Sequence, residues 1–170
     1  VIYQEQRLFE KSLIYHHQSL KLAQSENNVF GEGMSCNNIG GIYAQSFKDS
    51  VYVGLDYLDK ALVIFKSIDQ NDWTAMTYDK IALTQLKMGM FSEAETNANF
   101  SLLFALKSGA TQPTMRAYRT LYKVKDELNK GGEAFDYYQK YVHIRDSIYN
   151  ASLKISSASK ELEYQYKTDK

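Results

Sequence analysis

A nine-residue segment recurs three times along this chain at a constant spacing of 40 residues. Residues 54–62, 94–102 and 134–142 each begin with a tiny side chain, followed four, seven and eight residues later by further residues in register. These residues are Gly54, Ala94 and Ala134, then Leu58, Ala98 and Tyr138, then Ala61, Ser101 and Tyr141, then Leu62, Leu102 and Val142. Steps of three and four residues place them on one face of an α-helix. A helix that recurs at a fixed period predicts a stacked array of similar units.

A second helix precedes each copy, so the repeating unit is a pair of helices. The residues in register in these preceding segments are Ile39, Ile81 and Leu121. Turns within the pairs are expected at residues 48–50, 87–90 and 129–132. Gly89 and Gly131 suit the left-handed backbone that ends a helix, and Pro113 suits the first turn of a new one.

The composition favours an ordered helical protein and disfavours some functions. The 170 residues are 44% apolar and include one proline, which is too little for a disordered chain. Twenty basic residues balance twenty acidic ones, so we expect no nucleic-acid binding by this segment. No apolar run approaches the ~18 residues of a membrane helix. The chain starts at Val1 and reads as a segment of a longer protein, in which any membrane span would lie outside this sequence.

This pattern resembles the tetratricopeptide repeat. The residues that carry the resemblance are Tyr78, Ile81, Ala82, Gly89, Phe91, Ala94, Ala98 and Ser101. The spacing of 40 residues departs from the family's period of about 34, and Gln85, Tyr122 and Lys125 replace residues expected to be apolar or small. The resemblance implies an all-α fold, a right-handed solenoid of helical hairpins that ends here in a long C-terminal helix.

Two parts are therefore expected along the chain. Residues 1–147 form the repeat array, and residues 148–170 form a capping or linker helix. A partial repeat covers residues 1–27. It is indicated, 42 residues ahead of the next copy, by Ser12, His16, Ser19 and Leu20. Full repeats span about 30–68, 72–108 and 113–147.

The C-terminal part is also similar to the end of the sensor region in Bacteroidetes-type signalling proteins. The residues that carry this likeness are Tyr138, Tyr141, Asp146, Ser147, Ile148, Tyr149 and Asn150. The likeness implies a repeat array on the periplasmic side of the inner membrane that feeds a histidine kinase or a transcriptional regulator. The alternative is a cytoplasmic adaptor or chaperone-docking scaffold.

A narrow apolar seam runs along the last helix. Its members step by three and four residues and are Ile148, Ala151, Ile155, Ala158 and Leu162. Such a seam suits a homodimer formed through this helix. The alternative is that the helix caps the exposed face of the last repeat.

The resemblance also implies a concave groove lined by the first helix of each pair. Its candidate binding residues are Asn37, Gln45, Asp79, Lys87, Arg116, Arg119 and Lys123. The last three form a basic stripe, which suits a peptide or protein partner with a carboxylate or an acidic segment. The alternative is a solvated face that Asp126 and Glu127 neutralise in part.

Candidate residues for catalysis or metal binding are few. His16 and His17 are adjacent on a helix and point about 100° apart, and no cysteine or acidic pair stands at zinc spacing around them. Cys36, the only cysteine, is expected to be a small core residue. No arrangement typical of nucleophilic catalysis or phosphate binding is present. We therefore expect a non-catalytic module without metal or cofactor.

Overall fold

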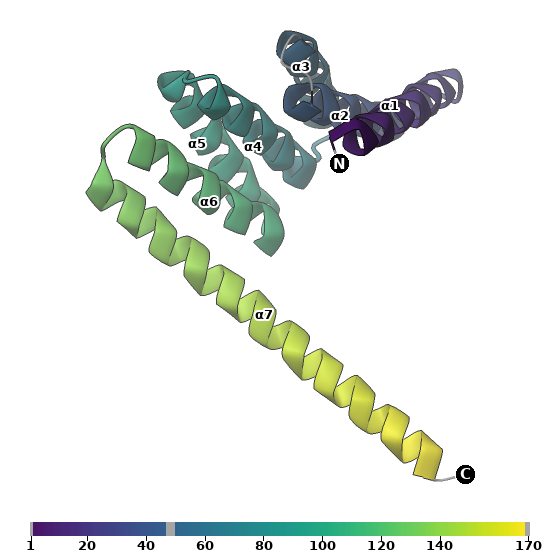
Figure 1. The fold of residues 1–170 in the computed structure, drawn as a ribbon, viewed down its shortest axis with the longest axis vertical. Coiled ribbons are helices and arrows are strands. Elements are labelled where there is room, and N and C mark those ends of the chain that lie inside the picture. Colours follow the sequence, from purple (N-terminus) through teal and green to yellow (C-terminus); the bar gives the residue numbers. More distant parts are fainter. Residues whose placement is uncertain (1, 47–49, 169–170) are drawn as a thin grey trace.

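The computed structural model describes residues 2–46 and 50–168, which form seven α-helices joined by short turns (Figure 1). The helices are α1 (Ile2–Ser25), α2 (Val29–Ser46), α3 (Val51–Ser67), α4 (Asn71–Lys87), α5 (Phe91–Ser108), α6 (Thr111–Glu127) and α7 (Gly131–Thr168). These described residues contain no strand, which confirms the predicted all-α class. None of the helices in this part of the chain is both long and apolar enough to span a membrane.

The 40-residue spacing of the sequence is also the spacing of the helix starts. The helices α3, α5 and α7 begin at Val51, Phe91 and Gly131, while α4 and α6 begin at Asn71 and Thr111. Each repeating unit therefore contains two helices, as predicted. The boundary expected between residues 147 and 148 falls inside the single continuous helix α7.

Four helix ends close with the same backbone arrangement. In each, the residue after a residue with positive φ donates its N–H to a carbonyl five positions earlier, at 2.8–2.9 Å. The positive-φ residues are Asn27, Asp69, Gly89 and Asn129, with φ of 54°, 54°, 75° and 56°. This left-handed turn satisfies carbonyl groups that the end of a helix leaves open.

Two of these turns test the sequence predictions. Gly89 has the predicted left-handed conformation. The prediction for Gly131 is wrong, because Gly131 is the first residue of α7 and Asn129 takes the left-handed position. Asparagine tolerates this conformation because its short side chain bonds locally. Pro113 lies in the first turn of α6, as predicted, whereas residues 48 and 49 of the turn expected at 48–50 lie outside the described residues.

Each helix packs mainly against the next helix along the chain. In addition, the backbone of α2 approaches that of α4, and α4 approaches α6, whereas the backbones of α1, α3, α5 and α7 do not approach one another in the described part of the chain. Only side chains bridge these helices, as where His17 of α1 meets Tyr57 of α3 at 5.9 Å between ring centres. The helices α2, α4 and α6 therefore form one row, which the other helices flank (Figure 1). The core is consequently a series of small clusters between neighbouring helices.

Two of these clusters show how the repeated residues are used. Leu58 and Leu62 of α3 pack against Tyr78 and Ile81 of α4. Forty residues later, Ala98 of α5 packs with Ala82 of α4 and Leu121 of α6. Residues at the same register thus bury the face of a flanking helix against the next helix of the row.

The repeated tiny residue marks a close approach of two helices. A Cβ atom placed on Gly54 would lie 2.7 Å from the backbone nitrogen of Ala44 and 2.8 Å from the carbonyl oxygen of Gly40. The equivalent Ala94 is fully buried and Ala134 is 7% exposed. A larger side chain at this position would push the two helix backbones apart.

Replacing Gly54 with alanine tests this close approach. Alanine favours a helix interior by about 1 kcal/mol over glycine. Because its Cβ would overlap the backbone of α2, we nevertheless expect the free energy of unfolding to fall by about 1–3 kcal/mol in urea denaturation. The matched control is Gly132→Ala in α7, where an added Cβ meets no atom within 4 Å. Equal stability of Gly54→Ala and the parent chain would contradict the close crossing of α2 and α3.

Candidate functional site

The predicted groove residues all lie on the row formed by α2, α4 and α6. Asn37 and Gln45 lie on α2, Asp79 and Lys87 on α4, and Arg116, Arg119 and Lys123 on α6. Their exposure divides them into two groups. Asn37 and Asp79 are only 1% exposed, Arg116 and Arg119 are half-buried, and Gln45, Lys87 and Lys123 are exposed. Asn37 and Asp79 therefore lie between helices and not on an open groove surface.

Asp79 joins α4 to α6. Its Oδ2 atom accepts a hydrogen bond from Nε of Arg116 at 3.1 Å, and its Oδ1 atom accepts one from the Thr120 hydroxyl at 2.5 Å. Arg116 forms an ion pair with Asp79 and keeps 33% of its side chain exposed. The Asp79 carboxylate is thus already committed to holding the row together, and part of the Arg116 charge is neutralised.

Asn37 has the equivalent position between α2 and α4. Its side-chain Oδ1 accepts a hydrogen bond from the Thr77 hydroxyl at 3.2 Å, and its backbone oxygen accepts one from Nζ of Lys80 at 3.0 Å. Its Nδ2 atom is buried and has no hydrogen-bond partner. A buried donor without an acceptor costs about 1–3 kcal/mol, so Asn37 is only partly satisfied by the fold.

Positive charge therefore predominates among the predicted groove residues that remain open. Lys87 and Lys123 are exposed, and Nε of Arg119 is buried without a hydrogen-bond partner. Asp79, the only acidic residue among the predicted groove residues, is buried and already bonded on both oxygens. The row thus presents guanidinium and ammonium donors with spare capacity for an acceptor.

Lys80 is a functional candidate that the sequence prediction missed. Burial, with a smaller effect of the Arg116 charge, lowers the pKa of Lys80 to about 8, although Asp79 opposes the shift. The sequence does hold a signal for it, since Lys80 and Thr120 are 40 residues apart and both reach back to the preceding helix of the row. This signal cannot be read from the sequence alone, because it becomes apparent only when the contacts between the helices are known.

The polar departures from the repeat pattern have partners across helices. Lys125 is 6% exposed, and its Nζ donates to Oε1 of Glu95 at 2.5 Å and to Glu133. Gln85 accepts a hydrogen bond from Nδ2 of Asn97 at 2.8 Å. These bonds connect α5 to α4, α6 and, through Lys125, to α7. A polar residue is therefore tolerated where an apolar one was expected.

The Lys125 cluster shifts two pKa values. Burial opposes the charge of Lys125, but the hydrogen bonds to Glu133 and Glu95 outweigh it and raise the pKa of Lys125. The hydrogen bond from Lys125, with a weaker one from Lys130, lowers the pKa of Glu95 despite partial burial. The charged form of Glu95 is thus bound more tightly in the folded state than in the unfolded chain.

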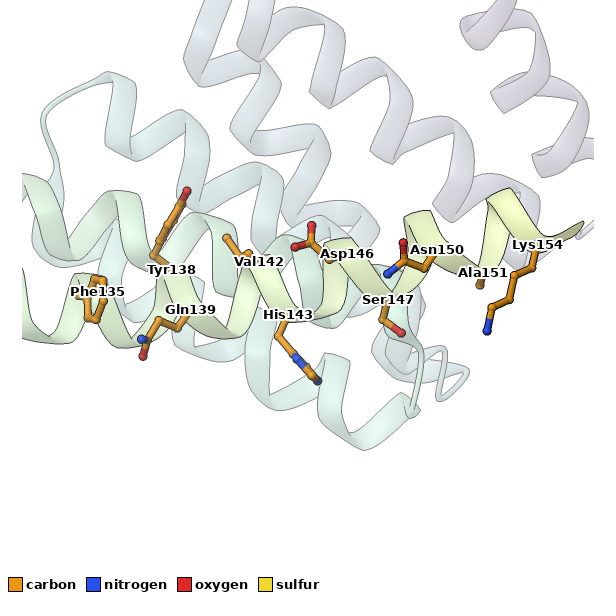
Figure 2. Close-up of a pocket in the computed structure, with 10 residues that line it drawn as sticks. All are labelled: Phe135, Tyr138, Gln139, Val142, His143, Asp146, Ser147, Asn150, Ala151 and Lys154. Carbon is orange, nitrogen blue, oxygen red and sulfur yellow. The ribbon is translucent and has the colours of Figure 1, made fainter. Parts of the chain in front are cut away.

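One face of α7 is largely open among the described residues, although Tyr138 on it contacts Tyr122 of α6 at 5.4 Å between ring centres. Figure 2 shows ten side chains along this face, all from α7. Phe135 and Tyr138 are 59% and 44% exposed, and Val142 is half-buried. Because one straight helix supplies the whole lining, this is an open face and not an enclosed cavity. Residues 151–162, which include most of the predicted seam, are all exposed.

Cys36, which the sequence analysis considered as a candidate residue, is a buried core residue. Cys36 is 3% exposed, and burial, with Glu32 nearby, raises the pKa of its thiol. A buried thiol of raised pKa is a poor nucleophile, and its contacts with Ala61 and Phe65 are those of a core residue. Within the described ranges, no group of three or more His, Cys, Asp or Glu side chains is placed to hold a metal ion.

Neither a family model nor a curated protein sequence matches this chain significantly. The geometry of the α2–α4–α6 row and of α7 is therefore the basis for its proposed function.

The Glu95–Lys125 ion pair yields a pH-dependent stability. Because the pKa of Glu95 is lowered in the folded state, its contribution is complete above its unfolded pKa of about 4.3 and is lost as the pH falls through the folded value. We expect Glu95→Gln to be less stable than the parent chain at pH 7, by on the order of 1 kcal/mol, and this difference to shrink below about pH 4.

Urea denaturation across this pH range measures the difference. Glu127→Gln is the control, because Glu127 is exposed on α6. A difference between Glu95→Gln and the parent chain that does not change with pH would contradict the ion pair.

Proposed function

We propose that this chain is a non-catalytic binding module in which tetratricopeptide-like hairpins stack into a right-handed solenoid. Three findings support the stacking: helix starts spaced by 40 residues, contacts only between near neighbours, and a continuous row of α2, α4 and α6. Repeat arrays of this kind use one row of helices as an extended binding surface. The row is the proposed surface here.

The proposed partner is a peptide or protein segment that carries acidic side chains. The observation that carries this proposal is the basic character of the open groove positions, where Lys87 and Lys123 are exposed and Arg119 is half-buried. Arginine binds carboxylates through two parallel hydrogen bonds, and Lys123 one turn further along α6 would add a second positive charge. The chain as a whole has zero formal net charge, so the attraction is local to this surface.

We further propose that the module is the extracytoplasmic sensory part of a membrane-bound histidine kinase or transcriptional regulator. The long helix α7 supports this role, because it continues without interruption from the last hairpin to Thr168. In this scheme, a segment bound on the row alters the packing of α6 on α7, and α7 transmits the change. A cytoplasmic adaptor or chaperone-docking scaffold is the alternative. Protease accessibility of the full-length protein in intact spheroplasts distinguishes the two locations.

The open face of α7 is proposed to bind a second copy of this chain. In α3 and α5, residues at this register are covered by the next helix of the row, as Leu58 is by Tyr78 and Ile81. The equivalent Tyr138 stays 44% exposed, because α7 continues straight and no described helix follows it. Pairing of two α7 helices would cover Tyr138 and Val142 in both chains, which is the self-complementary contact of a two-fold dimer.

Charge reversal on α6 tests the peptide-binding proposal. The double variant Arg119→Glu with Lys123→Glu should weaken binding of a fluorescein-labelled Glu-rich peptide about tenfold or more in an anisotropy titration. The Gln-rich counterpart of that peptide is the ligand control, and Lys107→Glu on α5 is the protein control. Arg116 is left intact, because Arg116→Glu would place a carboxylate beside buried Asp79 and disturb the fold. Unchanged affinity for the Glu-rich peptide would overturn the assignment of the row.

A charge on the open face of α7 tests the dimer. We expect Val142→Glu to convert a dimer to a monomer in sedimentation equilibrium, because burying an unpaired carboxylate in an apolar contact is strongly unfavourable. The control is Val63→Glu, the same substitution at a side chain that is 70% exposed on α3. A parent chain that is already monomeric at high concentration would rule out this pairing.

A further inference from the structure

A separate hollow of about 280 Å³ lies between α1, α2 and α4. Its polar lining comes from Ser12, His16, Asn38, Gln45 and Lys80, and its apolar wall from Phe9 and Ile42. Of these residues, only Gln45 belongs to the groove predicted from the sequence. The hollow is thus distinct from the surface around Arg119 and Lys123 on α6.

Lys80 reaches this hollow from the neighbouring helix of the row. Its Nζ is 3.0 Å from the backbone oxygen of Asn37, the acceptor that fixes the side chain against α2. Gly41 provides the space for it, since a Cβ at that position would lie 3.3 Å from Nζ and 3.5 Å from Cδ of Lys80. The ammonium group is therefore held by packing and by one neutral acceptor.

Among the side chains that the structure describes, nothing in the lining neutralises this charge. The lining contains no aspartate or glutamate, and α2 contributes no charged side chain to it. Asp79, next to Lys80 on α4, has both carboxylate oxygens bonded to α6, and Arg116 of α6 adds positive charge nearby. On α1, His16 also feels Lys80, because burial first and then Lys80 and His17 lower the pKa of His16. A half-buried cation with a neutral acceptor alone has a strong remaining affinity for an anion.

The size and walls of the hollow select the kind of anion. A volume of about 280 Å³ corresponds to roughly nine water molecules at about 30 Å³ each, which is below the range of drug-sized ligands. The hydroxyl of Ser12 and the amides of Asn38 and Gln45 supply donors for oxygen atoms, and Phe9 and Ile42 supply an apolar wall for a short carbon chain.

We propose that this hollow binds a small organic carboxylate, which pairs with the ammonium group of Lys80 and accepts hydrogen bonds from the surrounding hydroxyl and amide donors. The carboxylate belongs either to a free short-chain acid or to the C-terminal residue of a peptide. This binding does not require the acidic-peptide surface on α6.

Protonation links the proposed ligand to pH. Lys80 must be charged to pair with a carboxylate. Its contribution to the affinity is therefore complete below about pH 8, the pKa of Lys80 in the folded chain without ligand, and falls at higher pH. Bound carboxylate in turn raises the pKa of Lys80. His16 on α1 strengthens binding further only when it is protonated, at a pH below its lowered pKa.

The experiment is an NMR titration of the whole chain with ¹³C-labelled lysine, in which propionate is the probe and propionamide the neutral control. Propionate should raise the pKa of Lys80, followed at its Cε, and propionamide should leave it unchanged. Lys80→Met should weaken propionate binding at least tenfold, while Lys107→Met, which alters an exposed lysine on α5, should bind as the parent chain does. The pKa measurement on the parent chain needs no variant, so it stands even if Lys80→Met unfolds.

Further ligands identify the source of the carboxylate. Tighter binding of N-acetylalanine than of propionate would assign the hollow to a peptide C-terminus, and the reverse order would assign it to a free acid. Both orders support the proposal. A Lys80 pKa that propionate does not move, equal losses of propionate affinity in Lys80→Met and Lys107→Met, or a preference for inorganic phosphate over propionate would each overturn it.

Discussion

Burial by immediate neighbours is the constraint on which this structure depends. Each helix is covered by the helices before and after it, and α2, α4 and α6 are also joined to one another. No central core collects side chains from distant parts of the described sequence, so each contact between neighbours must be satisfied locally. The same rule leaves specific surfaces uncovered: the face of α7 beyond the last hairpin and the hollow beside α1. The proposed dimer contact lies on the face of α7, and the proposed carboxylate site lies in the hollow between α1, α2 and α4.

The contacts that join α2, α4 and α6 in the row differ from the contacts within each hairpin. Within hairpins, tiny residues such as Gly54 allow backbones to approach closely, and apolar clusters such as that of Cys36 with Phe65 fill the space around them. Along the row, apolar contacts such as that of Phe30 with Trp73 are joined by buried polar ones, in which Asn37 bonds to Thr77 and Lys80, and Asp79 to Arg116 and Thr120. Such bonds fix the spacing of the helices but do not balance every charge. Both binding sites proposed above rest on that imbalance.

Much of the architecture could be predicted because it repeats. A fixed period of 40 residues indicated the two-helix unit, and the positions of Gly54, Ala94 and Ala134 indicated the close crossings. The 40-residue period also indicates the correct turn residue, because Asn129 stands 40 residues after Gly89. The preference for glycine at helix ends instead led to the wrong prediction, Gly131. The candidate site was less predictable, because a helical pattern gives the direction of a side chain but not its depth. Asn37 and Asp79 point along the row yet are buried by the next helix, and Lys80 reaches a hollow that three helices create together.

The length of α7 has a mechanical consequence. From residue 147 to Thr168 the helix extends about 33 Å at 1.5 Å per residue, and residues 151–162 of this stretch are fully solvated. A tilt of about 10° where α7 leaves the last hairpin would move its far end by about 6 Å at this rise per residue. In the proposed signalling role, the α6–α7 contact, where Tyr122 is set edge-on against Tyr138 at 5.4 Å between ring centres, acts as the pivot of this lever arm. A small tilt of α7 at this contact then becomes a displacement of its far end comparable to one helical turn.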